Sequence, residues 1–168
     1  MGFHGRLLRE LQGSQELSSR KITLISEKCA KIGYKFVHEG GAEECKNCPL
    51  RKACIENLEE GRVYEVIGVR RKSHTCPLHG EKVVVVDVVQ AAVEAAVKKR
   101  LAIEGVIISY HPIVCDEPCR FKLICQPQGL KSGDRVKIEK LLEEIDCPLN
   151  FKLLKAVLRP ISSTSSEK

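Results

Sequence analysis

Two cysteine-rich stretches decide how this chain is organised: CKNCPLRKAC at residues 45–54 and CDEPCRFKLIC at residues 115–125. In each case a fourth cysteine follows 22 residues after the third, at Cys76 and Cys147, and Pro-Leu continues both. The spacings are C-x2-C-x5-C-x21-C and C-x3-C-x5-C-x21-C, which differ only in the first gap. Because the last three cysteines recur at a constant offset of 71 residues, the sequence predicts a tandem duplication of one structural unit.

The duplication sets the predicted domain boundaries. A chain of 168 residues has room for one compact domain or two small ones. We expect an N-terminal extension over residues 1–20, a first four-cysteine repeat over 21–90, a second over 91–160 and a disordered tail over 161–168. Any helix in the extension is expected to be short. Each repeat has only about 70 residues, and domains of that size often need a metal or a partner because their core is small.

Apolar residues recur three or four positions apart at the start of each unit, which predicts a helix there. They are Ile22, Ile25, Cys29 and Ile32 in the first unit and Val89, Val93, Val97 and Leu101 in the second. Strands are predicted at 34–38, 63–69, 82–88, 106–111, 136–145 and 151–158. The stretch 136–145 also suits a helix, and the repeat decides for a strand. The predicted fold class is α+β, a tandem duplication of two small helix-strand units, each with a four-cysteine metal or iron-sulfur site.

Composition predicts a soluble cytoplasmic protein. Hydrophobic residues make up 43% and charged residues 30%, as in ordinary globular domains. The longest apolar run, Val83 to Val86, ends at Asp87 and is much shorter than the roughly 20 residues of a membrane span. The first residues lack the apolar stretch of a secretory signal, so we expect the protein to stay in the cytoplasm.

Nine cysteines in a reducing compartment predict metal or cluster ligands before disulfides. Four thiolates suit zinc or an iron-sulfur cluster, because both take soft ligands in a tetrahedral arrangement. Zinc ribbons usually have two C-x2-C knuckles and each set here has at most one, so two 4Fe-4S clusters are favoured over two Zn2+ ions. Disulfides are a third option, because one Met and three Asn beside abundant Lys and Glu suit a heat-adapted source. The predicted ligands are Cys45, Cys48, Cys54 and Cys76 in the first unit and Cys115, Cys119, Cys125 and Cys147 in the second.

Part of the first set resembles a known iron-sulfur loop. Residues 45–54, read as C-x2-C-P-L-x3-C, resemble a portion of that loop in adenine DNA glycosylases, over ten residues. The glycosylase pattern has a further cysteine upstream, at the position that His38 occupies here. His38 is therefore an alternative ligand. Cys76 is favoured as the fourth ligand because it has a counterpart, Cys147, at the constant offset.

A second resemblance covers most of the chain. It is carried by the first three cysteines of each set, with His74, Cys76-Pro77-Leu78-His79, Val83–Val86 and Gly133–Val136. On these residues the chain resembles, over 20–158, the archaeal uncharacterised protein family UPF0179. The resemblance implies an archaeal cytosolic protein and implies no particular activity.

Charge favours a nucleic-acid partner only locally. The formal net charge is +6 with the cysteines counted as neutral. Four thiolates on Zn2+ or on a cluster core of charge +2 carry about −2 per site, which leaves about +2 for the whole chain. Two short basic runs are candidates for contacts with phosphates. They are Arg70, Arg71 and Lys72 in the first unit and Lys98, Lys99 and Arg100 on the predicted second helix.

Two functions from different classes fit these observations. The sequence has no P-loop, G-x-G-x-x-G, H-E-x-x-H or G-x-S-x-G motif, so we predict no catalytic residues. In the favoured interpretation the centres are structural and the protein is a module that associates with RNA or a ribonucleoprotein. In the alternative, the protein transfers electrons between redox partner proteins through two 4Fe-4S clusters, as two-cluster ferredoxins do. Neither function involves a membrane.

Overall fold

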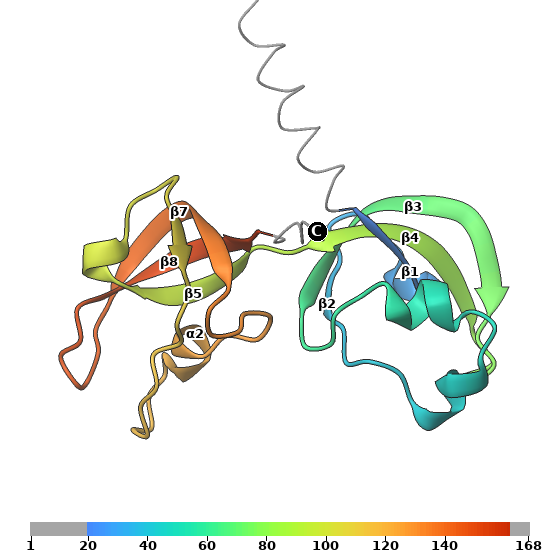
Figure 1. The fold of residues 1–168 in the computed structure, drawn as a ribbon, viewed down its shortest axis with the longest axis horizontal. Coiled ribbons are helices and arrows are strands. Elements are labelled where there is room, and N and C mark those ends of the chain that lie inside the picture. The colour runs from blue at the N-terminus through green and yellow to red at the C-terminus, as the bar shows by residue number, and fades with distance from the viewer. Residues whose placement is uncertain (1–19, 162–168) are drawn as a thin grey trace, which may run out of the picture. The chain divides into compact units, whose positions relative to one another are not determined.

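The computed structural model describes residues 20–161. Within them the chain forms two compact units, one made of 20–60 and 64–90 and the other of 61–63 and 91–161. We call these the first and the second unit. Each consists of one four-stranded sheet with short helical turns (Figure 1).

The first unit has the strand order β1-β4-β3-β2, and β1 and β3 both pair antiparallel with β4. Its strands are β1 (Lys21–Ser26), β2 (Lys35–Val37), β3 (Val63–Thr75) and β4 (Lys82–Gln90). Its helical turns are η1 (Glu27–Cys29), η2 (Glu43–Asn47) and η3 (Lys52–Glu56).

The second unit repeats this order as β5-β8-β7-β6, with all neighbouring strands antiparallel. The first three strands of the two units begin 72 residues apart. The strands are β5 (Val93–Lys98), β6 (Ile107–Ser109), β7 (Arg135–Ile145) and β8 (Leu153–Pro160). The helical turns are η4 (Lys99–Leu101) and α2 (Lys122–Cys125).

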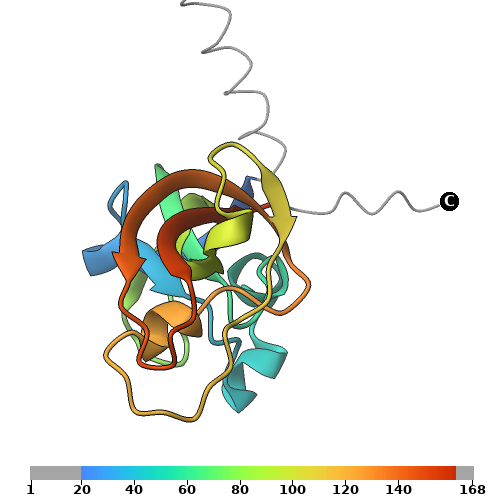
Figure 2. The same ribbon diagram turned by 90° about the vertical axis from the view of Figure 1, so that its left-hand side faces the viewer.

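The third strand of each unit is bulged in two places, and the sheets curl (Figures 1 and 2). In β3 the register with β4 shifts between Val66 and Gly68 and again between Val69 and Ser73. In β7 the register with β8 shifts between Ile138 and Lys140 and between Leu141 and Glu144. An extra residue on one strand bends it and increases its twist. The matching bulges therefore give both sheets the same curvature.

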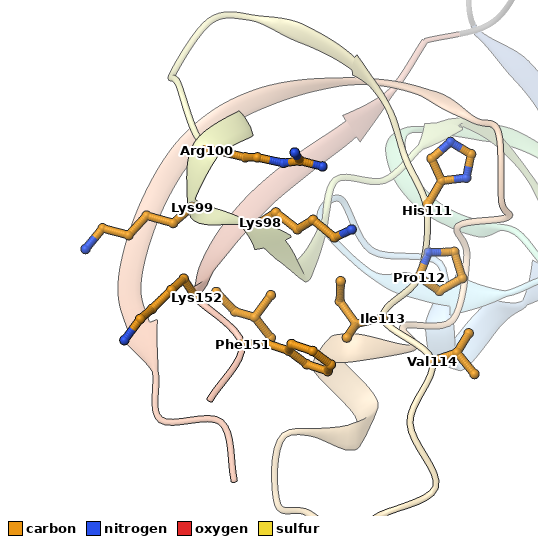
Figure 3. Close-up of a pocket in the computed structure, with 10 residues that line it drawn as sticks. Lys98, Lys99, Arg100, His111, Pro112, Ile113, Val114, Phe151 and Lys152 are labelled. Atoms are coloured by element: carbon orange, nitrogen blue, oxygen red, sulfur yellow. The ribbon is translucent and has the colours of Figure 1, made fainter. Parts of the chain in front are cut away.

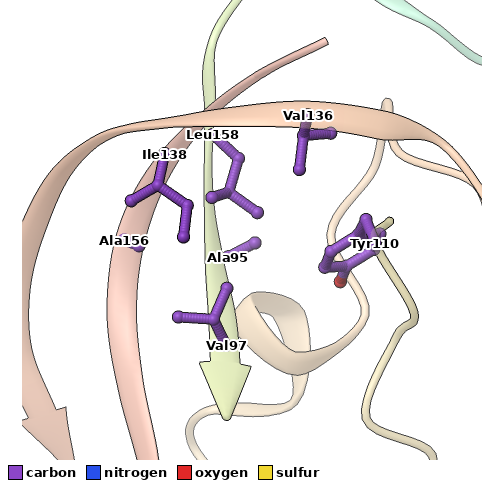
Figure 4. Close-up of a cluster of buried hydrophobic side chains, with 7 residues drawn as sticks. All are labelled: Ala95, Val97, Tyr110, Val136, Ile138, Ala156 and Leu158. Carbon is purple, nitrogen blue, oxygen red and sulfur yellow. The ribbon is translucent and has the colours of Figure 1, made fainter. Parts of the chain in front are cut away.

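Each curled sheet encloses a small apolar core. The first core is built from Leu58, Tyr64, Val66, Val86 and Val88. The main core of the second unit contains Ala95, Val97, Tyr110, Val136, Ile138, Ala156 and Leu158 (Figure 4). Along β5 the side chains alternate, so that Ala96 faces a separate cluster with Cys125, Ile145 and Leu153. The cysteine-bearing turn of the second unit thus covers the other side of β5.

The predicted α+β fold class is wrong, because the protein is mostly β. The segment around Ile22 and Ile25 forms β1 and the single turn η1, and the stripe from Val89 to Leu101 is divided among β4, β5 and η4. A spacing of four residues places side chains on one face of a strand as well as of a helix, because four is a multiple of two. β-branched residues recur in both segments, Ile22, Thr23 and Ile25 in one and Val89, Val93 and Val97 in the other, and they favour the strand. The other predicted strands are confirmed, including the stretch 136–145.

The predictions of a short helix in the N-terminal extension and of a disordered C-terminal tail fall outside the described residues, except for Arg20 and Ile161. Within 20–161 no helix combines the length and the apolar character that crossing a membrane requires.

Candidate metal centres

The third cysteine of each set is held against the first strand of its unit. Cys54 lies on η3, where its carbonyl accepts a hydrogen bond from Thr23 Oγ1 of β1 at 2.8 Å. The Cys54 thiol faces the carbonyl oxygen of Leu24, 3.8 Å from Sγ. Cys125 ends α2 and packs in the cluster that contains Ala96 of β5, with 6% of its surface exposed. Both units therefore anchor this cysteine by the same arrangement.

The other three cysteines of each set come from two further segments. Cys45 lies on η2 and Cys48 directly follows it, whereas Cys115 and Cys119 lie in the loop between β6 and α2. The fourth cysteine follows the long third strand, Cys76 immediately after β3 and Cys147 two residues after β7. A bound centre would thus tie a loop, a helical turn and the end of a strand together.

Electrostatics indicates that the four thiols of each set gather at one place. Burial raises the pKa of the Cys54 thiol, and the charges of Cys76, Cys45 and Cys48 raise it further. Burial likewise raises the pKa of Cys125, followed by the charges of Cys115, Cys119 and Cys147. In each unit the pKa of the third cysteine therefore responds to the other three cysteines of its own set.

The four cysteines of the second set line one cavity of about 10 Å³, which is room for a single water. Within 20–161 no group of three or more His, Cys, Asp or Glu side chains is arranged as a site for one metal ion. A tetrahedral zinc site with Zn–S bonds of about 2.3 Å requires sulfurs about 3.8 Å apart.

One backbone amide points at the sulfur of a predicted ligand. The Phe121 N–H donates to Cys119 Sγ at 3.4 Å, and such bonds stabilise thiolates and tune cluster potentials. All nine cysteines are free thiols. The ninth, Cys29 on η1, belongs to neither set and hydrogen-bonds with Tyr34, which raises the pKa of that phenol.

His38 packs against an aromatic side chain of the first core. Its ring is 8% exposed and meets the Tyr64 ring edge-on with centroids 6.5 Å apart. Burial lowers its pKa, while Glu60 and a hydrogen bond to the Ile55 backbone act in the other direction. His38 is the first residue after β2, as Tyr110 is after β6. Tyr110 donates its hydroxyl to the Cys125 carbonyl at 3.4 Å, so both residues support the helical turn of the third cysteine.

The first basic run lies on a bulge of β3, and all three of its residues are exposed, Arg70 with 47% of its side chain. Arg70 makes a two-bond contact with Asp87 of β4, Nε to Oδ2 at 3.0 Å and Nη2 to Oδ1 at 2.7 Å. The Arg70 hydrogen bond holds the pKa of the Asp87 carboxyl below its usual value. Arg71 and Lys72 are exposed. Arg70 is thus committed to a buried carboxylate, and the other two residues face solvent.

The second basic run ends β5 and forms η4, where the sequence predicts a helix. Lys99 forms a salt bridge with Glu144. Lys98 and Arg100 line a cavity of about 430 Å³ together with His111 and Phe151. Sequence reasoning missed the last two residues, because they come from segments 13 to 53 residues away from Lys98. A position-by-position comparison of the two repeats could have singled out Phe151.

Comparison with known proteins shows similar chains in several archaea. The UPF0179 family matches residues 21–158. A UPF0179 protein of Methanocaldococcus jannaschii is 39% identical over 145 residues, which cover 85% of this chain and 96% of that protein. One of Pyrococcus abyssi is 44% identical over 137 residues, covering 81% and 96%. One of Methanothermobacter thermautotrophicus is 41% identical over 143 residues, covering 83% and 97%.

No solved structure shows significant similarity to this chain. The matched region contains all eight predicted ligands, both sheets and both basic runs. On the match to its family and on these relatives, the chain belongs to the archaeal uncharacterised protein family UPF0179.

Proposed function

We propose that this protein binds two 4Fe-4S clusters, one in each unit, as the structural centres of a cytoplasmic module that associates with RNA or a ribonucleoprotein. The observation that carries the proposal is the recurrence of one arrangement. In both units the third cysteine is fixed against the first strand, within electrostatic reach of the other three.

The cysteine pattern favours a cluster over a single zinc ion, because zinc ribbons usually have two C-x2-C knuckles and each set here has at most one. In a four-iron cluster each cysteine binds a different iron. The partial resemblance of residues 45–54 to a glycosylase iron-sulfur loop points the same way. Two zinc ions are the competing occupants.

The small cores support a structural role for the centres. The first unit buries a cluster of only five core residues, and domains of this size gain little stability from apolar burial alone. A centre on four cysteines would join η2, η3 and the end of β3 in the first unit. Ligand binding then contributes directly to the folding free energy.

Electron transfer is a second candidate, which the amide hydrogen bond to Cys119 favours. A cluster supplies a reversible one-electron couple when bound, and hydrogen bonds to its ligand sulfurs tune the potential. The partial exposure of Cys115, Cys119 and Cys147 would leave the second centre near the surface.

Anaerobic purification with iron, sulfide and zinc analysis tests the centres. We expect about eight iron and eight sulfide per chain and an absorption band that dithionite bleaches. About two zinc and no colour would contradict the cluster assignment. If the role is structural, removal of the metal should abolish cooperative unfolding. Electron transfer would be favoured instead if the clusters cycle reversibly between oxidised and reduced states and the protein binds a partner protein in both states.

The RNA association has a separate test. Fluorescence anisotropy of a short single-stranded RNA should show binding by the metal-loaded chain, with an affinity that falls as salt rises because Lys and Arg displace counterions. Absence of binding at low salt would contradict the RNA part and leave the assignment of the centres intact.

A further inference from the structure

The second unit has a cavity of about 430 Å³ that is separate from its core. This size falls within the range of small-molecule sites, roughly 300 to 1,000 Å³. The cavity lies at the end of β5. The loop after β6 and the start of β8 form its other walls (Figure 3). Its lining residues are Lys98, Lys99, Arg100, His111, Pro112, Ile113, Val114, Phe151, Lys152 and Leu153.

The lining combines positive charge with an apolar floor. Lys98 and Arg100 extend in the same direction, toward His111 and Pro112, whereas Lys99 and Lys152 extend to the opposite side (Figure 3). Lys99 is paired with Glu144. None of the described residues that line the cavity is acidic. Lys98 and Arg100 are therefore the two cations that an occupant would meet.

The floor offers one aromatic face. The Phe151 ring lies beside Ile113 in Figure 3 and is 47% exposed. His111 is held at the edge by Ser132, whose Oγ lies 2.9 Å from Nδ1, and by Ser109 at 3.5 Å from Nε2. Planar bases stack on exposed aromatic rings, and Arg and Lys bind phosphate. The single ring of Phe151 can stack on one base.

The corresponding corner of the first unit has no such chemistry. Lys98 pairs with Leu153 in the sheet, and Ser26 pairs with Val83, so Lys98 corresponds to Ser26 and Phe151 to Glu81. The turns agree, because Gly80 and Asn150 both have φ in the left-handed region. In the first unit Glu27 binds Lys82 at 2.6 Å and Glu81 lies 3.9 Å from Lys28. The acidic and basic side chains of that corner therefore neutralise each other's charge.

We propose that the cavity of the second unit binds one nucleoside phosphate, with the base against Phe151 and Ile113 and the phosphate on Lys98 and Arg100. The inference deepens the proposed association with RNA and rests on it where the nucleoside phosphate belongs to an RNA strand. A free nucleotide presents the same chemistry. The floor carries few groups that distinguish one base from another, so the site should accept different bases.

The test uses the full chain, purified anaerobically with its metal content. Calorimetric titrations with 5′-AMP and with inorganic phosphate, and anisotropy with a fluorescent hexanucleotide, measure the affinity. Phe151→Leu should weaken binding of AMP and RNA about tenfold, because it removes the stacking face. The double variant Lys98→Ala with Arg100→Ala should weaken both at least about tenfold and flatten the salt dependence.

Two controls isolate the cavity. Ile32→Ala removes an apolar side chain of the first unit that is 74% exposed, and Arg71→Ala with Lys72→Ala removes two exposed charges there. Both should leave AMP binding unchanged. Because Phe151 also lines the cysteine cavity, the iron or zinc content of each variant must equal that of the unaltered chain. The leucine keeps apolar bulk beside that centre.

The outcomes separate the two sources and the two proposals. If the chain binds AMP and the cavity variants weaken that binding, the ligand is a free nucleotide. If the chain binds only the hexanucleotide and the same variants weaken that binding, the ligand is RNA. Phosphate binding as tight as AMP binding would overturn the inference, since the base would contribute nothing. RNA binding that depends on Arg71 and Lys72 but not on the cavity would overturn the inference and keep the RNA association. No binding of any ligand would overturn both.

Discussion

The two units share one strand order and one arrangement of cysteines, but they carry their positive charge in different places. In the first unit the basic residues Arg71 and Lys72 lie on the bulge of the third strand. In the second unit the same bulge carries Glu143 and Glu144, and the exposed positive charge lies at the end of β5. Positions that hold the sheet or the cysteines are alike, whereas surface charge has diverged.

This difference separates two kinds of constraint. Val66 and Val88, which pair in the first unit, occupy the same positions as Ile138 and Leu158, which pair in the second. All four side chains are fully buried and apolar. Surface residues lose little when they change, because substitutions there usually alter stability by less than about 0.5 kcal/mol. A duplicated fold can therefore acquire a binding surface on one copy while the other copy keeps a neutral corner.

Replacing the third cysteine of either unit should have the largest effect and shows whether the two centres are independent. Cys54→Ser should remove the first centre and Cys125→Ser the second, because each is the cysteine of its set that is held against the first strand of its unit. We expect metal analysis to show half the content of the unaltered chain in either variant. Cys29→Ser is the matched control and should keep the full content. Complete loss from one substitution would mean that the units depend on each other.

Substitutions that create cavities in the two cores should have the second-largest effect. Leu158→Ala should lower the free energy of unfolding by about 2 to 5 kcal/mol, because Leu158 is completely buried. Its counterpart change Val88→Ala removes less volume and should cost about 2 kcal/mol. Denaturant titration monitored by circular dichroism measures both. Leu123→Ala, at an 82% exposed site, should change almost nothing. Equal effects of Leu158→Ala and Leu123→Ala would contradict the assignment of the core.

The ion pair between Arg70 and the buried Asp87 should make the first unit sensitive to acid. Because Arg70 holds the Asp87 pKa below its usual value, the charged pair contributes stability above about pH 4, and this is lost as pH falls through the lowered pKa. Arg70→Ala lets the pKa rise, so acid unfolding should begin at higher pH. Arg71→Ala, which leaves the pair intact, should follow the unaltered chain in the same pH titration. Identical acid curves for the two variants would remove the role assigned to Arg70.

The neutral corner of the first unit should give the smallest effect. Lys82 and Glu27 are 2.6 Å apart, with 54% and 55% of their side chains exposed. Lys82→Ala should lower the free energy of unfolding by less than about 1 kcal/mol, because water and salt screen exposed pairs. Thermal unfolding at low and high salt checks this, and the effect should shrink as salt rises. An effect that grows with salt would point to packing instead of charge.

Much of the fold could be predicted because β-branched runs and the repeat place six of the eight strands. The two first strands were missed, since a stripe such as Val89, Val93 and Val97 fits both periods. The spacing of the cysteines predicts which four belong together. It does not predict that Arg70 binds Asp87 or that His38 packs on Tyr64. Those contacts join residues 17 or more positions apart, and only the sheet brings them together.

The sequence by itself determined the duplication, the two sets of four cysteines and the family, because each is a pattern of residue types at fixed spacing along the chain. The tertiary structure decided which basic side chains face solvent and which one neutralises a buried carboxylate. It also decided that the end of β5, the loop after β6 and the start of β8 enclose one cavity. Such a cavity depends on strand register and curvature, and these follow from packing between distant segments rather than from any local pattern.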